Sequence, residues 1–275
     1  MGDIDTIKKI ALRAGEIVME YYGKKYEVKE KSDIKGKSPC TVADEQSNEF
    51  IVNELKKKFP ADAILSEESV DDLSRLRHRR VWLVDPLDGT RDFIAGTVDF
   101  SIMIGLVVDG GPVLGVVFAP ARDELYWAEK EKGAFLQQNG VTRQIRVRQE
   151  QAWEKLILVT RNTKDERKED ALVHELGIQN MLPAGSVGVK LGLIASGQAD
   201  IHINTNFLAR EWDTCAPEII LKEAGGVITN LKGDTLIYNK QETQHKYSFV
   251  ASNTQSLHEK VLKKIKTIAK KHKLF

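Results

Sequence analysis

The sequence has little cysteine, little proline and no excess of either charge. It contains two cysteines, Cys40 and Cys215, and seven prolines among 275 residues. Two cysteines exclude a scaffold held by several disulfides and suit a reducing compartment, so we expect a cytoplasmic protein. Lys and Arg total 41 against 40 Asp and Glu, a net charge of +1. This balance argues against a dedicated nucleic-acid-binding protein, which usually carries a strong basic excess.

Long hydrophobic runs are also absent. The nearest candidate for a membrane span, residues 101–119, is interrupted by Asp109-Gly110-Gly111-Pro112. This interruption leaves two segments of strand length, too short to cross a bilayer as helices. We therefore predict a β-hairpin in a soluble protein that has no membrane partner.

The chain nevertheless has ample material for a packed core, since 41% of its residues are hydrophobic. At about 150 residues per domain, the length suits one large or two modest domains. The apolar periodicity predicts helices at 7–21, 43–59, 185–194 and 213–224, and strands at 63–66, 81–84, 102–108, 113–119, 125–128, 156–160, 199–203 and 227–229. Strands dominate before residue 145, and strands and helices alternate after it. We predict an α/β fold with subdomains at 1–145 and 146–275.

Two polar segments each allow more than one interpretation. Residues 24–39 are polar and include a glycine and a proline, a composition typical of a mobile loop. Residues 260–275 carry seven lysines and one histidine, which suits a basic arm for anions or nucleic acid. However, apolar side chains recur at helical spacing from Leu257 to Ile268. We therefore favour a terminal helix that docks on the protein and exposes its lysines.

Acidic residues gather where predicted strands end or a helix begins. Glu67 and Glu68 follow one strand, Asp85 and Asp88 follow another, and Asp213 starts a helix. Oxygen ligands without a Cys or His set suit Mg²⁺ or Mn²⁺ rather than zinc. Glu67-Glu68 alone also fits a solvated turn, and Asp213 alone fits a helix N-cap. Asp85 and Asp88 are harder to explain without a cation, because two carboxylates so close to a dry strand repel each other.

Together these motifs resemble those of the inositol monophosphatase family of Mg²⁺-dependent, lithium-sensitive phosphatases. They are Glu-Glu at 67–68, Asp-Pro-Leu-Asp-Gly-Thr at 85–90, and Trp-Asp at 212–213 followed by Glu-Ala-Gly-Gly at 223–226. The Asp-x-Asp-Gly-Thr motif of aspartate-nucleophile phosphatases is one residue shorter and does not fit. The resemblance implies a layered αβαβα sandwich with the metal site between two subdomains, and a homodimer is common in the family.

The resemblance also implies which residues hold the metal ions. Glu67, Asp85 and the carbonyl of Leu87 would hold a first Mg²⁺. Asp85, Asp88 and Asp213 would hold a second, with Asp85 bridging the two. The expected cofactor is therefore two or three Mg²⁺ per site, with Mn²⁺ as a substitute and Li⁺ as an inhibitor.

The family's catalytic pair corresponds to Asp44 and Thr90, which would polarise the attacking water, and we count Glu67 with them. A threonine hydroxyl is not a strong base, so Asp44 would have to take up or orient its proton. The segment 31–37 matches a loop that closes over the site and often helps a third metal, which Glu68 would support less directly.

Substrate contacts are predicted at the helix start near residue 185, where backbone N–H groups can bind phosphate. The proposed contact residues are Gly89, Thr90, Gly185, Ser186, Lys190 and Asp213. For Lys190, a solvent-facing position and a substrate-anion role are equally compatible with the sequence. Cys40 and Cys215 both flank proposed site residues; a redox-sensitive pair is one interpretation, and ordinary buried side chains are the favoured one.

The sequence allows more than one interpretation of the substrate. Residues 85–101 and 211–218 are most similar to the 3'(2'),5'-bisphosphate nucleotidase branch, which removes the 3'-phosphate of adenosine 3',5'-bisphosphate. The alternative is a broader phosphatase acting on inositol 1-phosphate or fructose 1,6-bisphosphate. A more remote alternative is a catalytically inactive relative that serves as an anion-binding scaffold. In each enzymatic interpretation the partner is a small phosphorylated substrate and not a nucleic acid polymer.

Overall fold

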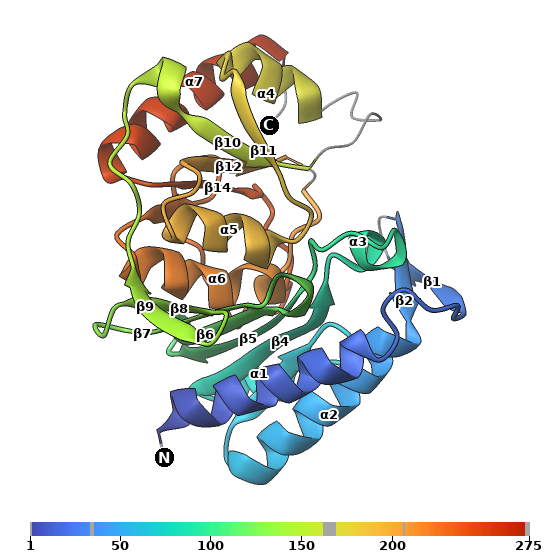
Figure 1. The fold of residues 1–275 in the computed structure, drawn as a ribbon. Helices are drawn as coiled ribbons and strands as arrows, with labels where there is room; N and C mark the ends of the chain where they lie inside the picture. The colour runs from blue at the N-terminus through green and yellow to red at the C-terminus, as the bar shows by residue number, and fades with distance from the viewer. Residues whose placement is uncertain (1, 34–35, 162–168, 206, 273–275) are drawn as a thin grey trace.

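A computed structural model describes residues 2–33, 36–161, 169–205 and 207–272 and shows five layers (Figure 1). One outer layer is the helix pair α1 (Asp3–Met19) and α2 (Val42–Lys58). A seven-stranded sheet, the helices α5 (Val187–Ala195) and α6 (Glu211–Glu223), and a five-stranded sheet follow. The other outer layer holds α4 (Glu169–Leu176) and α7 (Gln255–His272). This αβαβα sandwich confirms the predicted fold.

The seven-stranded sheet follows the order of the sequence, β3-β4-β5-β6-β7-β8-β9. Its strands are β3 (Ala63–Ser66), β4 (Arg80–Asp88), β5 (Ser101–Val108), β6 (Gly111–Ala119), β7 (Glu124–Glu129), β8 (Ala134–Gln138) and β9 (Val141–Ile145). β3 pairs parallel with β4, and the remaining neighbours pair antiparallel. The predicted hairpin is confirmed as β5 and β6. Strands β8 and β9 were not predicted, and the turn Asn139-Gly140 joins them.

The five-stranded sheet has the order β11-β10-β12-β14-β13, so neighbours in space are often distant in sequence. Its strands are β10 (Ile157–Thr160), β11 (Asn180–Pro183), β12 (Ile201–Asn204), β13 (Val227–Thr229) and β14 (Phe249–Ser252). β10 pairs parallel with β11 and β12, whereas β14 runs antiparallel to β12 and β13. The last strand of the chain therefore occupies an inner position.

The polar segment 24–39 is not the loop that we predicted. Strands β1 (Val28–Asp33) and β2 (Gly36–Thr41) pair antiparallel, from Val28↔Thr41 to Asp33↔Gly36. Their sequence offers almost no apolar residues whose alternation could reveal a strand, which is why the pattern suggested a loop. Residues 34–35, at the centre of the segment expected to close over the site, lie outside the described residues.

The C-terminal segment docks as a helix, as favoured. Leu257, Val261, Ile265 and Ile268 of α7 are buried in one apolar cluster with residues of the five-stranded sheet. The lysines at 260, 263, 264, 266 and 270 are exposed on the other side. Within the described ranges, no helix is long and apolar enough to cross a membrane.

The two predicted subdomains share a hydrophobic core. One cluster combines Leu83 and Met103 from the seven-stranded sheet with Leu191 of α5 and Ile219 of α6. The helices of the second half thus complete the core of the first. We retain the division at residue 145 as a proposal about how the sequence is organised.

Helix α6 lies close to strands β5 and β6 at a pair of glycines, one on each strand. Gly105 pairs with Gly115. A Cβ atom at Gly105 would lie 2.6 Å from Sγ of Cys215, and one at Gly115 would lie 2.4 Å from the carbonyl oxygen of Ala216. Because the Gly115 contact is with helix backbone, a side chain there would displace α6. The two glycines therefore set the distance between the sheet and α6, the helix that carries Asp213.

We expect Gly115→Ala to lower the free energy of unfolding by about 1–3 kcal/mol, the usual cost of overpacking. Gly111→Ala on the same strand is the matched control, because its Cβ would meet only the carbonyl oxygen of Val108, at 4.0 Å. Urea unfolding followed by circular dichroism measures both variants. Equal stability of the two variants would contradict the close approach of α6.

Candidate active site

A β-bulge in β4 sets the direction of Asp85 and Asp88. Between the pairs Asp85↔Met103 and Asp88↔Ser101, β4 advances by three residues and β5 by two. Side chains three residues apart in a regular strand point to opposite faces. The extra residue of the bulge re-aims the strand, so the two carboxylates can serve one site. The strand continues through this bulge, beyond its predicted end at Val84.

Four carboxylates from distant parts of the chain act on one another. Asp85 is 2% exposed, and burial raises its pKa well above the usual range, with further increases from Glu67, Asp88 and Asp213. Burial likewise raises the pKa of Asp213, and Asp88 and Glu67 add to the effect. The structure thus brings together the acidic residues that the sequence singled out.

The chemistry of this group fits a hard divalent cation. Its donors are carboxylate oxygens, and such oxygen sets suit Mg²⁺. The Leu87 carbonyl, which lies 3.0 Å from the Thr90 hydroxyl, stays a predicted ligand. Buried carboxylates that repel one another are costly unless a cation neutralises them. The raised pKa values of Asp85 and Asp213 express this cost.

Asp88 is held by the N-terminus of α5. Its Oδ2 accepts hydrogen bonds from the Ser186 hydroxyl and from the Gly188 backbone N–H, the latter at 3.1 Å. The Ser186 N–H donates to the carbonyl of Asp99. Burial raises the pKa of Asp88, and the bonds from Ser186 and Gly188 oppose that rise. These donors orient Asp88 here, and the contact of Gly185 and Ser186 with substrate remains a prediction.

Lys190 is buried, with 7% of its surface exposed, so its interpretation as a solvent-facing lysine is wrong. Its positive charge opposes the rise in the pKa of Asp88. Lys190 also acts on His202 of β12, whose pKa falls to about 3, chiefly because of burial. The ammonium group therefore lies inside the protein, between the acidic site and the five-stranded sheet.

Asp44 and Thr90 are in contact, as the predicted catalytic pair requires. The Thr90 hydroxyl lies 3.0 Å from Oδ1 of Asp44 and 3.0 Å from the Leu87 carbonyl oxygen, and it can donate to either. Asp44 Oδ2 accepts bonds from the backbone N–H and hydroxyl of Thr41, at 2.7 and 2.6 Å. Burial raises the pKa of Asp44 to about 6. A carboxyl group with this pKa can gain or lose a proton close to neutral pH, and the catalytic role of Asp44 stays a prediction.

Thr41 is a positioning residue that sequence reasoning missed. It caps α2, and its Asp44 partner closes a capping box at the start of that helix. The Thr-x-x-Asp spacing at 41–44 resembles the known capping-box signature and could have revealed it.

Gly89 lets the chain turn from β4 into the short helix α3 (Thr90–Ile94). Its φ of 87° lies in the left-handed region, which favours glycine. A Cβ atom there would also lie 2.7 Å from the carbonyl oxygen of Asp99. Gly89 therefore positions Thr90, and its contact with substrate stays a prediction.

The two cysteines have separate surroundings. Cys40 Sγ lies 3.5 Å from Oε2 of Glu68, and ligand atoms of Cys40, Asp44 and Glu68 lie within 4.8 Å of one another. Cys215 packs over Gly105 instead. Neither thiol is in a disulfide and both are buried, and burial raises the pKa of Cys215. Glu68 therefore adjoins the catalytic pair, and the thiols are not joined.

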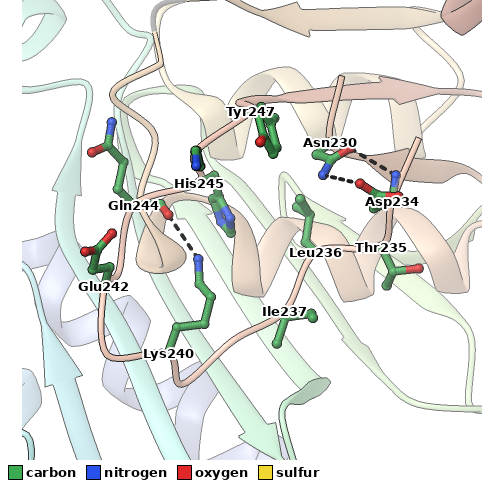
Figure 2. A pocket seen from close by; sticks show the side chains of 11 residues that line it. Asn230, Asp234, Thr235, Leu236, Ile237, Lys240, Glu242, Gln244, His245 and Tyr247 are labelled. Carbon is green, nitrogen blue, oxygen red and sulfur yellow. Dashed lines mark hydrogen bonds between the residues drawn. The ribbon is translucent and has the colours of Figure 1, made fainter. Parts of the chain in front are cut away.

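A separate hollow lies beside the loop that precedes β14. This cavity of about 490 Å³ is lined mainly by residues 234–247 (Figure 2). None of the predicted site residues lines it. The acidic cluster, rather than the size of a cavity, therefore locates the candidate active site.

The layered fold and the acidic cluster define an αβαβα protein with a candidate site for divalent metal ions. The model of the inositol monophosphatase family matches residues 3–270. The chain belongs to this family and is therefore a phosphomonoesterase.

Named relatives cover most of the chain. A 3'(2'),5'-bisphosphate nucleotidase CysQ of Aggregatibacter actinomycetemcomitans is 34% identical over 254 residues, covering 92% of this chain and 93% of that protein. A fructose-1,6-bisphosphatase/inositol-1-monophosphatase of Thermotoga maritima is 30% identical over 268 residues, covering 98% and 97%. Among solved structures, an inositol monophosphatase of Thermotoga maritima superposes with a TM-score of 0.82 at 29% identity, covering 98% and 99%.

Proposed function

We propose that the protein removes the 3'-phosphate of adenosine 3',5'-bisphosphate to give AMP in a Mg²⁺-dependent reaction. The similarity to the bisphosphate nucleotidase of Aggregatibacter actinomycetemcomitans carries this choice of substrate. The second candidate is a phosphatase for fructose 1,6-bisphosphate or inositol 1-phosphate, which the Thermotoga maritima relative favours.

The acidic group supplies the metal ligands in this proposal. Glu67, Asp85 and the carbonyl of Leu87 would hold one Mg²⁺, and Asp85, Asp88 and Asp213 would hold another. A third ion and replacement by Mn²⁺ are part of the proposal. Bound Mg²⁺ lowers the pKa of water and neutralises the charge of the phosphate and leaving oxygen. We also expect Li⁺ to inhibit the enzyme.

Thr90 and Asp44 handle the proton of the attacking water. Thr90 Oγ1 accepts a hydrogen bond from water while its own proton is directed to Oδ1 of Asp44, 3.0 Å away. The bonds from Thr41 hold the Asp44 carboxylate in place, and its pKa of about 6 leaves it mostly ionised at pH 7. Glu67 is counted with this pair because its carboxylate is one of the proposed ligands of the first metal ion.

The substrate phosphate enters a site whose protein groups are mainly acidic, so positive groups must bind it. Lys190 is the buried cation that interacts with Asp88, and we propose that it also attracts the substrate anion. The remaining proposed contacts are Gly89, Thr90, Gly185, Ser186 and Asp213.

A catalytically inactive scaffold is the least supported alternative, because the Thr90–Asp44 contact has no evident purpose in one. We also propose that the protein forms a homodimer and is located in the cytoplasm. Its chain is organised into subdomains at 1–145 and 146–275 in this proposal.

The test compares phosphate release from adenosine 3',5'-bisphosphate, inositol 1-phosphate and fructose 1,6-bisphosphate. We expect the highest kcat/KM for the first substrate, complete loss of activity with EDTA, recovery with Mg²⁺ and inhibition by Li⁺. A higher kcat/KM for either sugar phosphate would select the second candidate. Release of phosphate from none of the three would refute the enzymatic proposal.

A further inference from the structure

A buried arginine lies in the segment that Glu67 begins. Arg75 is 1% exposed and belongs to the short helix η1 (Ser74–Arg77), between β3 and β4. Its Nε and Nη2 donate to Oδ2 of Asp71, at 3.0 and 2.8 Å. This ion pair links two residues of the same segment and uses only some of the N–H donors of the guanidinium group.

The rest of the guanidinium binds a segment more than 160 residues away. Nη1 donates to Oδ1 of Asn239 at 2.8 Å, and Nη2 donates to the carbonyl of Lys240 at 2.9 Å. Asn239 returns a bond from Nδ2 to the carbonyl of Arg75, at 3.2 Å. The two segments are therefore joined by bonds in both directions. A planar fork suits such a junction, because one guanidinium reaches several acceptors.

The same distant segment binds the first residue of α6. The backbone N–H groups of Asn239 and Lys240 donate to the two carboxylate oxygens of Glu211, at 2.6 and 3.0 Å. The Lys240 ammonium lies 3.6 Å from Oε1 of Glu211, and it also donates to the carbonyl of Gln244 (Figure 2). Glu211 is completely buried and stands two residues before Asp213.

These contacts form one continuous connection, which we call the Arg75 clamp: Asp71, Arg75, Asn239, Lys240 and Glu211. Its charges balance, with two acidic and two basic groups. One end lies in the segment that follows Glu67, and the other is the first turn of the helix that carries Asp213. Arg75 and Glu211 are buried, whereas the Asp71 and Lys240 side chains are 24% and 31% exposed. Removing one partner of a buried charged group is costly, so the buried members hold each other in a defined arrangement.

We infer that Arg75 is a positioning residue for the metal site, acting through Asn239 and Glu211 to fix Asp213 relative to Glu67. This inference rests on the metal ligands of the proposed function. Loss of the clamp removes none of the four carboxylates, but Asp213 is then no longer fixed relative to Glu67. The expected consequence is weaker Mg²⁺ binding, with turnover restored when Mg²⁺ is raised.

The test measures Mg²⁺ binding to the substrate-free protein by isothermal titration calorimetry, together with kcat at saturating Mg²⁺. We expect Arg75→Gln to raise the Mg²⁺ dissociation constant at least tenfold and to keep kcat within threefold of the wild type. Arg75→Lys retains the charge but not the fork, so its dissociation constant should be intermediate. Asn239→Gly should raise the constant at least threefold, since glycine accepts the φ of 57° at this position.

Arg148→Gln is the control, because Arg148 forms an ion pair at 3.0 Å with the fully buried Asp200 and touches no part of the clamp. It should lower Tm yet leave the Mg²⁺ dissociation constant within twofold. If Arg75→Gln does not fold, Asn239→Gly decides the question. A wild-type constant in the folded variants overturns the inference alone, whereas wild-type protein that binds no Mg²⁺ overturns the proposed function with it.

Discussion

Asp85→Asn is expected to reduce phosphate release by at least about three orders of magnitude while the protein remains folded. The substitution removes the charge that we propose bridges two metal ions, and metal ions contribute several kcal/mol to such transition states. Asparagine keeps the size of the side chain and an oxygen that can accept the bond from the Leu87 N–H, which lies 3.1 Å from Asp85 Oδ1.

Although Asp85→Asn should lose activity, its stability without metal should be equal to or higher than that of the wild type. Asp85 is repelled by Glu67, Asp88 and Asp213, and its pKa is raised. A carboxylate with a raised pKa destabilises the folded state at neutral pH. Removal of its charge should therefore keep or raise Tm without Mg²⁺, while the increase in Tm on adding Mg²⁺ should shrink.

Differential scanning calorimetry with and without Mg²⁺, combined with the phosphate assay, measures both effects. Asp123→Asn is the control, because this carboxylate accepts a bond from the Asn139 N–H in a turn outside the acidic site. Its activity should stay within twofold of the wild type. Near-normal activity of Asp85→Asn would show that the metal assignment is wrong.

The second large effect is expected at the Thr90–Asp44 pair. Thr90→Val retains the shape of the side chain but cannot pass a proton, and Asp44→Asn cannot receive one. General acid–base catalysis contributes about 10²–10⁴-fold, so each variant should lose that much kcat. Because the two groups act as one unit, the double variant should lose little more than either single variant.

Two further measurements separate this role from metal binding. Thr90→Ser keeps the hydroxyl and should retain most of the activity. Mg²⁺ dissociation constants of Thr90→Val and Asp44→Asn should stay within threefold of the wild-type value. Additive losses in the double variant, or a Thr90→Val enzyme with more than a tenth of wild-type kcat, would contradict the proton path.

The acidic residues of the site could be found in the sequence because they lie in short motifs. Residues 85–90 contain two carboxylates, the turn glycine and Thr90 in one stretch, and Asp213 follows a tryptophan. The bulge that aims Asp85 and Asp88 was not predictable from those residues, because it depends on pairing with Met103 and Ser101. Sequence motifs therefore identified the acidic residues, whereas the pairing of β4 with β5 determines where their side chains point.

Other features were hidden for definite physical reasons. All nine residues of α5 are buried, because the helix lies between two sheets. It therefore has no polar face, and the sequence could not tell whether Lys190 points inward or outward. Strand β9 is mostly exposed, so it lacks an apolar alternation. Arg75 stands in a polar segment, and its partner Asn239 is 164 residues away.

The order of the elements along the chain determines which ligands of the site are synthesised first. Strands β3 to β9 pair with their sequence neighbours, so that sheet can assemble as the chain emerges. By contrast, β12 and β13 are both bonded to β14, which ends at Ser252. A nascent chain released to residue 200 already carries Glu67, Asp85 and Asp88 but not Asp213. The acidic cluster can therefore form only after α6 has been synthesised and has packed on β5 and β6.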